Sequence, residues 1–151
     1  MKEILDDKDL LVLDVLREHA DYSIRQMAKK TLLPPTTILH RLKKLKSLGV
    51  IKRYTVETDR RKLGQMLSAY VLISIDLKSL KEKHKSQFDV AKDLRKVPQL
   101  EKVDIVTGES ADIIVRMHTK DIEEFNAVVL GKIHAVDGVA KTTSMIIMSE
   151  Q

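Results

Sequence analysis

The chain has 151 residues and a formal net charge of +5, a length that allows one ordinary domain or two small ones. Its 43% of hydrophobic residues excludes a disordered chain, and the absence of cysteine excludes disulfides and thiolate metal sites. The N-terminal residues MKEILDDKD lack the apolar core of a signal peptide, and the longest apolar runs fall far below the roughly 20 residues of a membrane span. We therefore expect a soluble protein of the cytoplasm that does not enter membranes.

The first two helices are expected at residues 6–18 and 23–30. The acids Asp6, Asp7 and Asp9 lie at the beginning of the first helix, where negative charge complements the helix dipole. The same cluster has the composition of a metal site, but no further ligands follow at the spacing of a metal-binding loop. The second helix opens with the pattern Ser-x-x-Gln, which fits a capping box.

A turn at residues 31–33 leads into a third helix, which begins at Pro35 and ends before Gly49. Proline suits the first helical position, where its missing N–H is not needed, and glycine suits the position after the last turn, where φ is usually positive. One face of this helix is apolar and consists of Ile38, Leu42 and Leu45. The opposite face consists of Thr36, His40, Lys43 and Ser47, flanked by Thr37 and Lys44.

The charge around the third helix is one-sided. Residues 22–56 contain nine Lys or Arg and no Asp or Glu, whereas the 21 residues before them carry a net charge of −4. A basic face with short polar groups at its N-terminal end suits a polyphosphate. We therefore expect a helix-turn-helix whose last helix enters the major groove of double-stranded DNA. The alternative is a Lys-rich solvated face that binds nothing.

Two residues of the third helix, His40 and Arg41, each have two possible roles. His40 contacts a phosphate or a base, or it is merely an exposed side chain. Arg41 lies beside the apolar face, so its stem packs while its head either contacts a phosphate or pairs with an acid of the first helix. We expect one or two of the three lysines of the helix to contact phosphates, and Arg53 completes the DNA-binding candidates.

The end of the DNA-binding region is marked by composition. Residues 51–58 contain Tyr, Thr and Val and favour a strand, and paired strands here would form a wing. A polar, basic junction follows at residues 59–64. We therefore place a DNA-binding domain at residues 1–60, a linker at 61–66 and a second domain at 67–151.

The second domain is expected to have the order βαββαβ, which is the ferredoxin-like pattern. In chain order, we expect a strand at 67–76, a Lys-rich loop or fraying helix start at 78–85, a helix at 86–96, strands at 100–106 and 112–118, a helix at 120–134 capped by Thr119, and a strand at 139–148. The fold class is therefore α+β, an N-terminal winged helix-turn-helix followed by a ferredoxin-like domain. Helices on one face of a four-stranded sheet leave the other face to bury, which predicts a homodimer or higher homo-oligomer, or a ligand on that face.

A winged helix-turn-helix followed by βαββαβ resembles the Lrp/AsnC family, the leucine-responsive or feast/famine transcription regulators. The resemblance covers essentially the whole chain. The residues that carry it are Leu5-Asp6, Leu33, Thr37-Ile38, Arg41, Leu45, Gly49-Val50-Ile51, Leu63-Gly64, Val97-Pro98, Thr107-Gly108 and Asp112. The resemblance implies a DNA-binding regulator whose C-terminal domain oligomerises and senses a small molecule, with an amino acid as the candidate effector.

Three positions depart from the family pattern. Leu32 stands where the family usually has Gly in the turn, and Pro34 stands where members often have Ser at the helix cap, so both concern the tilt of the third helix. The loop at residues 107–112 is one residue longer than the family's loop and lacks its aromatic residue. If the family's amino-acid pocket is carried over, it uses Thr107, Gly108, Ser110 and Asp112.

The loop at residues 107–112 offers the groups that a zwitterionic amino acid needs. Hydroxyls and backbone amides suit its carboxylate, and the carboxylate of Asp112 suits its ammonium group. Because no aromatic ring covers an apolar side chain, we expect a small or polar amino acid. The alternative is a solvated hairpin loop in which Gly108 marks only a turn.

The chain shows no catalytic constellation. Its five histidines lack the H-x-x-x-H spacing of a metal helix, and no phosphate-binding glycine motif is present. We therefore expect no enzyme, no cofactor and no metal site. The main interpretation is a transcription regulator that oligomerises and senses a metabolite, and the alternative is a ligand-independent architectural protein that organises DNA. A third, more remote interpretation is a regulatory subunit of a metabolic enzyme, which would bind no DNA.

Overall fold

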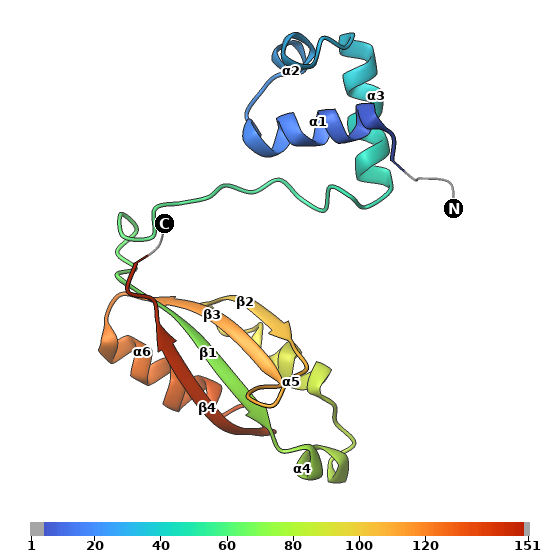
Figure 1. Cartoon of the computed structure of the whole chain (residues 1–151). Coiled ribbons are helices and arrows are strands. Elements are labelled where there is room, and N and C mark those ends of the chain that lie inside the picture. Colours follow the sequence, from blue (N-terminus) through green and yellow to red (C-terminus); the bar gives the residue numbers. More distant parts are fainter. Residues whose placement is uncertain (1–4, 150–151) are drawn as a thin grey trace. The chain divides into compact units, whose positions relative to one another are not determined.

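The computed structural model describes residues 5–149. The chain forms two compact units, the helical unit (residues 1–57) and the sheet unit (residues 58–151). Figure 1 shows the three helices of the first and the sheet of the second. In the described part of the chain, no helix is both long enough and apolar enough to cross a membrane.

Three helices form the helical unit: α1 (Asp7–Glu18), α2 (Ile24–Thr31) and α3 (Pro35–Ser47). Local sequence signals set their ends, and these predictions are confirmed. Ser23 and Gln26 form a reciprocal capping box before α2, and Gly49 follows α3 with a φ of +70°. Each helix contributes apolar residues to one core, which consists of Val12, Val15, Leu16, Met27, Ile38 and Leu45.

The turn between α2 and α3 forms although it lacks the usual glycine. Leu32 adopts a left-handed conformation with a φ of 57°, and its side chain is 89% exposed. This conformation costs a non-glycine residue about 1–2 kcal/mol. Thr31 stabilises the turn, because its hydroxyl donates to the carbonyl of Met27 at 2.8 Å and accepts from the N–H of Leu33 at 3.3 Å.

The strand predicted at residues 51–58 is not formed, and this prediction is wrong for the isolated chain. Residues 52–58 have no regular secondary structure. Side chains that favour strands produce one only when a neighbouring strand accepts and donates the backbone hydrogen bonds. Between residues 5 and 149, the four strands that pair all belong to the sheet unit.

The sheet unit is a four-stranded antiparallel sheet with the order β2-β3-β1-β4, as the ferredoxin-like pattern predicts. Its elements are β1 (Leu67–Ile75), α4 (Leu77–Glu82), α5 (Gln87–Leu94), β2 (Leu100–Ile105), β3 (Ile113–Thr119), α6 (Ile122–Val128), a π-helical turn η1 (Val129–Ile133) and β4 (Val139–Ile146). The central strand β1 pairs with β3, where Val71 faces Val115, and with β4, where Leu72 faces Thr143.

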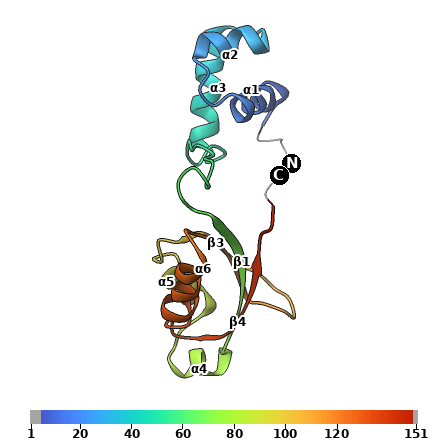
Figure 2. The same ribbon diagram turned by 90° about the vertical axis from the view of Figure 1, so that its left-hand side faces the viewer.

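The helices of the sheet unit lie on one face of the sheet. Figure 2 shows α5 and α6 together on the same side of the strands. The side chains of β1 alternate accordingly: Val71 and Ile73 are completely buried beneath the helices, whereas Tyr70, on the other face, is 37% exposed. The other face of the sheet therefore carries none of the described helices of the sheet unit.

Two local predictions in this unit are corrected. Residues 78–85 were expected to be a loop or a fraying helix start, but a short helix forms because Asp76 caps it, accepting from the N–H groups of Lys78 and Ser79 at 3.0 Å. Thr119 does not cap α6. It is the last residue of β3, and the carboxylate of Asp121 caps the helix by accepting from the N–H of Glu124.

Candidate DNA-binding surface and effector loop

The outer face of α3 presents the side chains that were predicted to contact DNA. Thr36 and His40, towards the N-terminal end, and Lys43, one turn further, are exposed, while Thr37 is half-buried. They lie opposite the buried stripe of the helix. The face therefore offers short or planar hydrogen-bonding groups near the N-terminal end, the part of a recognition helix that contacts base edges, with a cation behind them.

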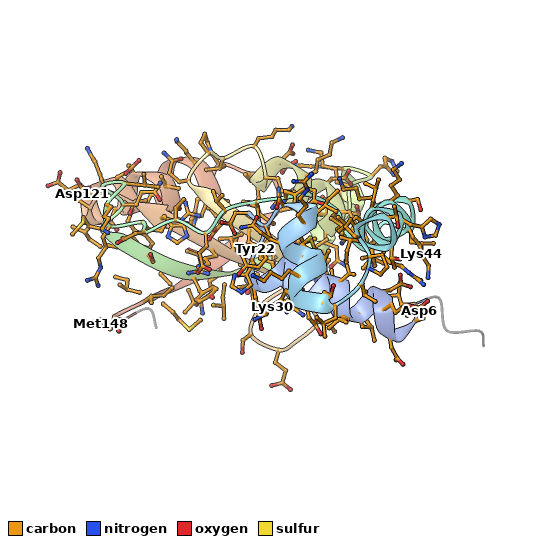
Figure 3. All side chains as sticks on the ribbon, turned by 90° about the horizontal axis from the view of Figure 1, so that it is seen from above. Asp6, Tyr22, Lys30, Lys44, Asp121 and Met148 are labelled. Atoms are coloured by element: carbon orange, nitrogen blue, oxygen red, sulfur yellow. The ribbon has the colours of Figure 1, made fainter. Side chains whose placement is uncertain are left out.

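An ion-pair cluster joins α3 to the beginning of α1. The carboxylate of Asp9 is completely buried and accepts hydrogen bonds from the Lys44 ammonium group and from Nη1 of Arg41, the latter at 3.1 Å. The same Arg41 nitrogen lies 2.5 Å from Oδ2 of Asp6. Figure 3 shows Asp6 and Lys44 at the same end of the helical unit. The four side chains are called the α1–α3 cluster below.

The α1–α3 cluster keeps its acids ionised. Burial of the Asp9 carboxyl would raise its pKa, but hydrogen bonds from Lys44, from the backbone of Asp6 and from Arg41 outweigh burial and lower the pKa to about 2. The pKa of Asp6 is lowered mainly by the hydrogen bond from the backbone N–H of Asp9. The pKa of Arg41 is raised mainly by its hydrogen bond to Asp6. Both acids are therefore charged at neutral pH.

The cluster changes how two predicted DNA contacts are interpreted. Arg41 takes the second of its two interpretations, because it pairs with acids at the beginning of the first helix. Lys44 is committed to the buried Asp9, which the sequence did not predict, so we leave it out of the phosphate contacts proposed below. Asp6 and Asp9 lie at the beginning of α1, where they complement the helix dipole, and they also pair with Arg41 and Lys44 of α3.

Three more side chains belong to the end of α3 or to the segment that follows it. Ser47 donates its hydroxyl to the carbonyl of Lys44 at 2.9 Å, so its donor is used within the helix. The Lys46 ammonium lies 4.8 Å from the centre of the Tyr54 ring, a cation–π distance that ties the end of α3 to the segment after it. Arg53, on that segment, is exposed.

The exposed face of α2 carries residues that were absent from the predicted site. A hollow of about 350 Å³ is lined by Tyr22, Gln26, Lys29 and Lys30. In helix-turn-helix proteins, the helix before the recognition helix crosses the DNA backbone. Both lysines belong to the acid-free basic stretch of residues 22–56, so the sequence already indicated that α2 could contact DNA.

The predicted effector loop divides into an exposed tip and a fixed end. Thr107, Gly108 and Ser110 are exposed. Asp112 is engaged with the sheet, because its Oδ2 accepts from the N–H of Ile75 at 2.8 Å. Its carboxylate therefore pins the loop to β1, and only its other oxygen is left for an amino group. Gly108 has no positive φ, and a Cβ atom added there would have no described atom beyond its chain neighbours within 4 Å, so the turn does not require glycine.

Comparison with known proteins identifies both halves of the chain. Residues 5–52 match a family model described as winged helix-turn-helix DNA-binding, and residues 68–151 match the model of the Lrp/AsnC ligand binding domain. The chain belongs to the Lrp/AsnC family. It is 33% identical, over 97% of its length and 94% of the relative's, to an uncharacterised helix-turn-helix transcriptional regulator of Pyrococcus furiosus.

Solved Lrp/AsnC proteins have the same fold. A transcriptional regulator from Neisseria meningitidis, solved in complex with L-methionine, is 26% identical with a TM-score of 0.85, and the match covers 97% of this chain and 91% of that one. Escherichia coli AsnC is 22% identical with a TM-score of 0.80, over 97% of this chain and 93% of that one, and shows the fold alone. The protein is therefore a transcriptional regulator with a helix-turn-helix domain and an Lrp/AsnC ligand-binding domain. Within residues 5–149, no three His, Asp or Glu side chains are grouped to hold a metal ion.

Proposed function

We propose that this Lrp/AsnC regulator reads a DNA half-site with α3. The observation that supports this most is the outer face of that helix, where Thr36 and His40 are exposed beside Thr37. In this proposal these three side chains contact base edges, while Lys43 and Arg53 contact phosphates. The α1–α3 cluster supports the proposal, because it holds α3 against the beginning of α1. In addition, Lys29 and Lys30 of α2 contact further phosphates along the DNA backbone.

The protein is proposed to act as a homodimer, with higher oligomers built from it, through the open face of the sheet. Tyr70 and Met145 are paired across β1 and β4 on this face, and they are 37% and 49% exposed. Leu72 and Ile114, paired across β1 and β3, adjoin them and are half-buried. A contiguous apolar patch on a sheet face is typical of a surface that a second copy covers. Two copies would read a pseudo-palindromic site with half-sites about one helical turn apart.

The effector is proposed to be a small or polar amino acid bound at the loop 107–112. The complex of the Neisseria meningitidis relative with L-methionine supports an amino acid as the ligand class. The exposed hydroxyls of Thr107 and Ser110 suit a carboxylate, and the free oxygen of Asp112 suits an ammonium group. The competing proposal, a ligand-independent architectural protein, predicts DNA binding that no amino acid changes.

The function is tested by selecting bound sites from a random DNA pool, alone and with each of the twenty amino acids. A recovered palindromic motif whose affinity changes with one amino acid supports the regulator. Equal affinity for selected and random DNA, measured across salt concentrations, supports the architectural alternative. A thermal-shift screen with the same amino acids is independent of DNA, because a bound ligand raises the melting temperature.

The dimer is tested by placing a charge on the open face. Tyr70→Glu places a carboxylate in the proposed interface, beside Arg116 of β3. Burying an ion pair there costs more than burying an aromatic ring, so we expect a monomer by sedimentation at micromolar concentration. Phe88→Glu is the matched control, because Phe88 is equally aromatic and 66% exposed but lies on α5, at the covered face. A wild-type monomer, or a Tyr70→Glu dimer as tight as the control, contradicts the proposed interface.

A further inference from the structure

The junction between the two units ends in an ordered turn at the edge of the sheet unit. The carboxylate of Asp59 accepts from the N–H groups of Arg61 and Lys62, at 3.1 and 3.3 Å. The N–H of Gly64 donates to the carbonyl of Arg61 at 2.9 Å, and the N–H of Gln65 donates to that of Arg60, also at 2.9 Å. Residues 59–65 therefore form a closed turn directly before β1.

A chain of polar contacts holds this turn against the sheet. The guanidinium of Arg60 donates to Oε1 of Glu101 on β2 and to the side chain of Gln65. The other oxygen of Glu101 lies 2.8 Å from Nε2 of His118, which is 3% exposed. The second ring nitrogen of His118 lies 2.9 Å from the hydroxyl of Ser68 on β1. We call Arg60, Glu101, His118 and Ser68 the linker latch.

The latch joins the turn to three strands, and its central carboxylate is strongly held. Glu101 also lies 3.6 Å from Nε of Arg116, so cationic or hydrogen-bonding groups from the turn and from β3 converge on it. The hydrogen bond from His118 is the largest cause that lowers the pKa of Glu101, and the charge of Arg60 adds to it. The carboxylate is therefore ionised at neutral pH, the form that binds a guanidinium. The residues of the linker latch are not among those proposed to contact DNA or to bind the effector.

We propose that Arg60 and Glu101 are positioning residues that shorten the tether of the DNA-reading unit and thereby set which half-site spacings the dimer accepts. This inference rests on the proposed dimer. It adds a determinant of DNA specificity that lies outside the DNA-binding unit.

The length of free chain gives the size of the effect. Ile51 is still anchored in the helical unit, because its N–H donates to the carbonyl of Leu45 at 3.1 Å and its side chain packs against the core. With the latch closed, residues 52–58 lie between the two anchors, contact α3 through Tyr54 and Lys46, and span at most about 25 Å at ~3.6 Å each. With the latch open, the free segment extends to residue 66 and spans at most about 54 Å.

A longer tether lowers the preference for one spacing. The effective concentration of a second binding site falls roughly as the −3/2 power of tether length, so opening the latch reduces it about 3-fold at the optimal spacing. The longer reach also allows half-sites that the short tether cannot span. We therefore expect a flatter dependence of affinity on spacing, with unchanged affinity for one half-site.

The test uses the full chain and DNA probes that carry two selected half-sites, with the spacing varied in single base pairs over one helical turn. Arg60→Ala and Glu101→Gln should each reduce, several-fold, the ratio of the DNA affinity at the best spacing to the affinity at the worst spacing. The double variant should show the same ratio as the single variants. Lys62→Ala is the matched control, because Lys62 is a cation of the same turn that reaches only Asp59, at 3.7 Å. Arg60→Lys, which keeps the charge, should restore part of the ratio.

Hydrogen exchange at the amides of Gly64 and Gln65 reports whether the latch has opened. Variants that lose protection of these two amides but keep the wild-type dependence of affinity on spacing overturn the inference. Variants that keep both the amide protection and the wild-type dependence on spacing overturn it as well. A wild-type dimer that is indifferent to spacing also overturns it, while the proposed dimer stands. A wild-type monomer overturns the proposed function and the latch together, so sedimentation separates the two failures.

Discussion

Replacement of Asp9 by Asn tests whether the α1–α3 cluster stabilises the DNA-reading helix. Asn has nearly the same shape and can still accept from the N–H of Asp6, which bonds Oδ2 of Asp9 at 3.0 Å. It removes the charge that faces Lys44 and Arg41, and its NH2 group replaces the oxygen that accepts from Arg41. The change therefore tests the charge and the hydrogen bond to Arg41 together, at nearly constant side-chain volume.

The pKa of Asp9 gives the magnitude. It lies at about 2 in the folded protein against an ordinary value of 3.8, and each pKa unit corresponds to about 1.4 kcal/mol. The ionised carboxylate therefore stabilises the fold by on the order of 2 kcal/mol at neutral pH. Because the folded pKa is the lower one, this contribution is complete above pH ~4 and is lost as the pH falls from about 4 to about 2.

Hydrogen exchange in the full chain measures the effect in each unit separately. At pH 7, the Asp9→Asn variant should lose about 30-fold in the protection of α1 and α3 amides, which corresponds to 2 kcal/mol. The sheet unit should be unchanged. Asp7→Asn is the control, because Asp7 is an exposed acid of the same helical turn that interacts mainly with the helix dipole.

The pH dependence provides the sharper test. Wild type and Asp9→Asn should differ by about 2 kcal/mol at pH 7 and by less than about 0.5 kcal/mol at pH 2, where about half of the Asp9 carboxyl is protonated in the folded protein. A difference that persists at pH 2 would assign the effect to packing or to the cap. Equal losses for Asp9→Asn and Asp7→Asn at pH 7 would refute the idea that the cluster couples the two helices.

Three further predictions concern α3 and the turn before it. Lys43→Ala should lower the slope of log affinity against log salt by about 0.9, whereas Lys44→Ala should leave the slope unchanged and destabilise the helical unit. Thr36→Ala and His40→Ala should change the sequence recovered by site selection, and recovery of the wild-type motif would remove these residues from base contact. Leu32→Gly should stabilise the helical unit by up to about 1 kcal/mol in urea unfolding, whereas Leu32→Ala, which keeps the left-handed penalty, should not.

The elements that could be predicted from sequence are those whose signals are local. The second and third helices were found because Ser23, Gln26, Pro35 and Gly49 act within one turn of the helix end that they mark. The βαββαβ order followed from alternation and helical periodicity, which also act over short distances. Such signals depend only on residues that are near in sequence, so they can be recognised without knowledge of the fold.

What was missed depends on residues that are distant in sequence. Lys44 and Asp9 are 35 positions apart, and no local pattern distinguishes a lysine that pairs from one that is solvated. The strand expected at 51–58 did not form for a related reason, since its side chains favour a strand but none of the strands within residues 5–149 pairs with it. His118 showed no motif, because its partners come from two other strands.

The acidic beginning of the chain and the acid-free basic stretch after it are linked by ion pairs. The nine cations of residues 22–56 suggest a strongly salt-dependent interface, but two of them, Arg41 and Lys44, are neutralised by acids of the first stretch. Seven cations of residues 22–56 remain for DNA, which limits the contribution of this stretch to the salt slope to about 6. A steeper slope would require the α1–α3 cluster to open on DNA, and the acids that hold α3 would then oppose binding. Selection for a rigid recognition helix and selection for maximum charge thus conflict at these two positions, and the contacts of Asp9 favour rigidity.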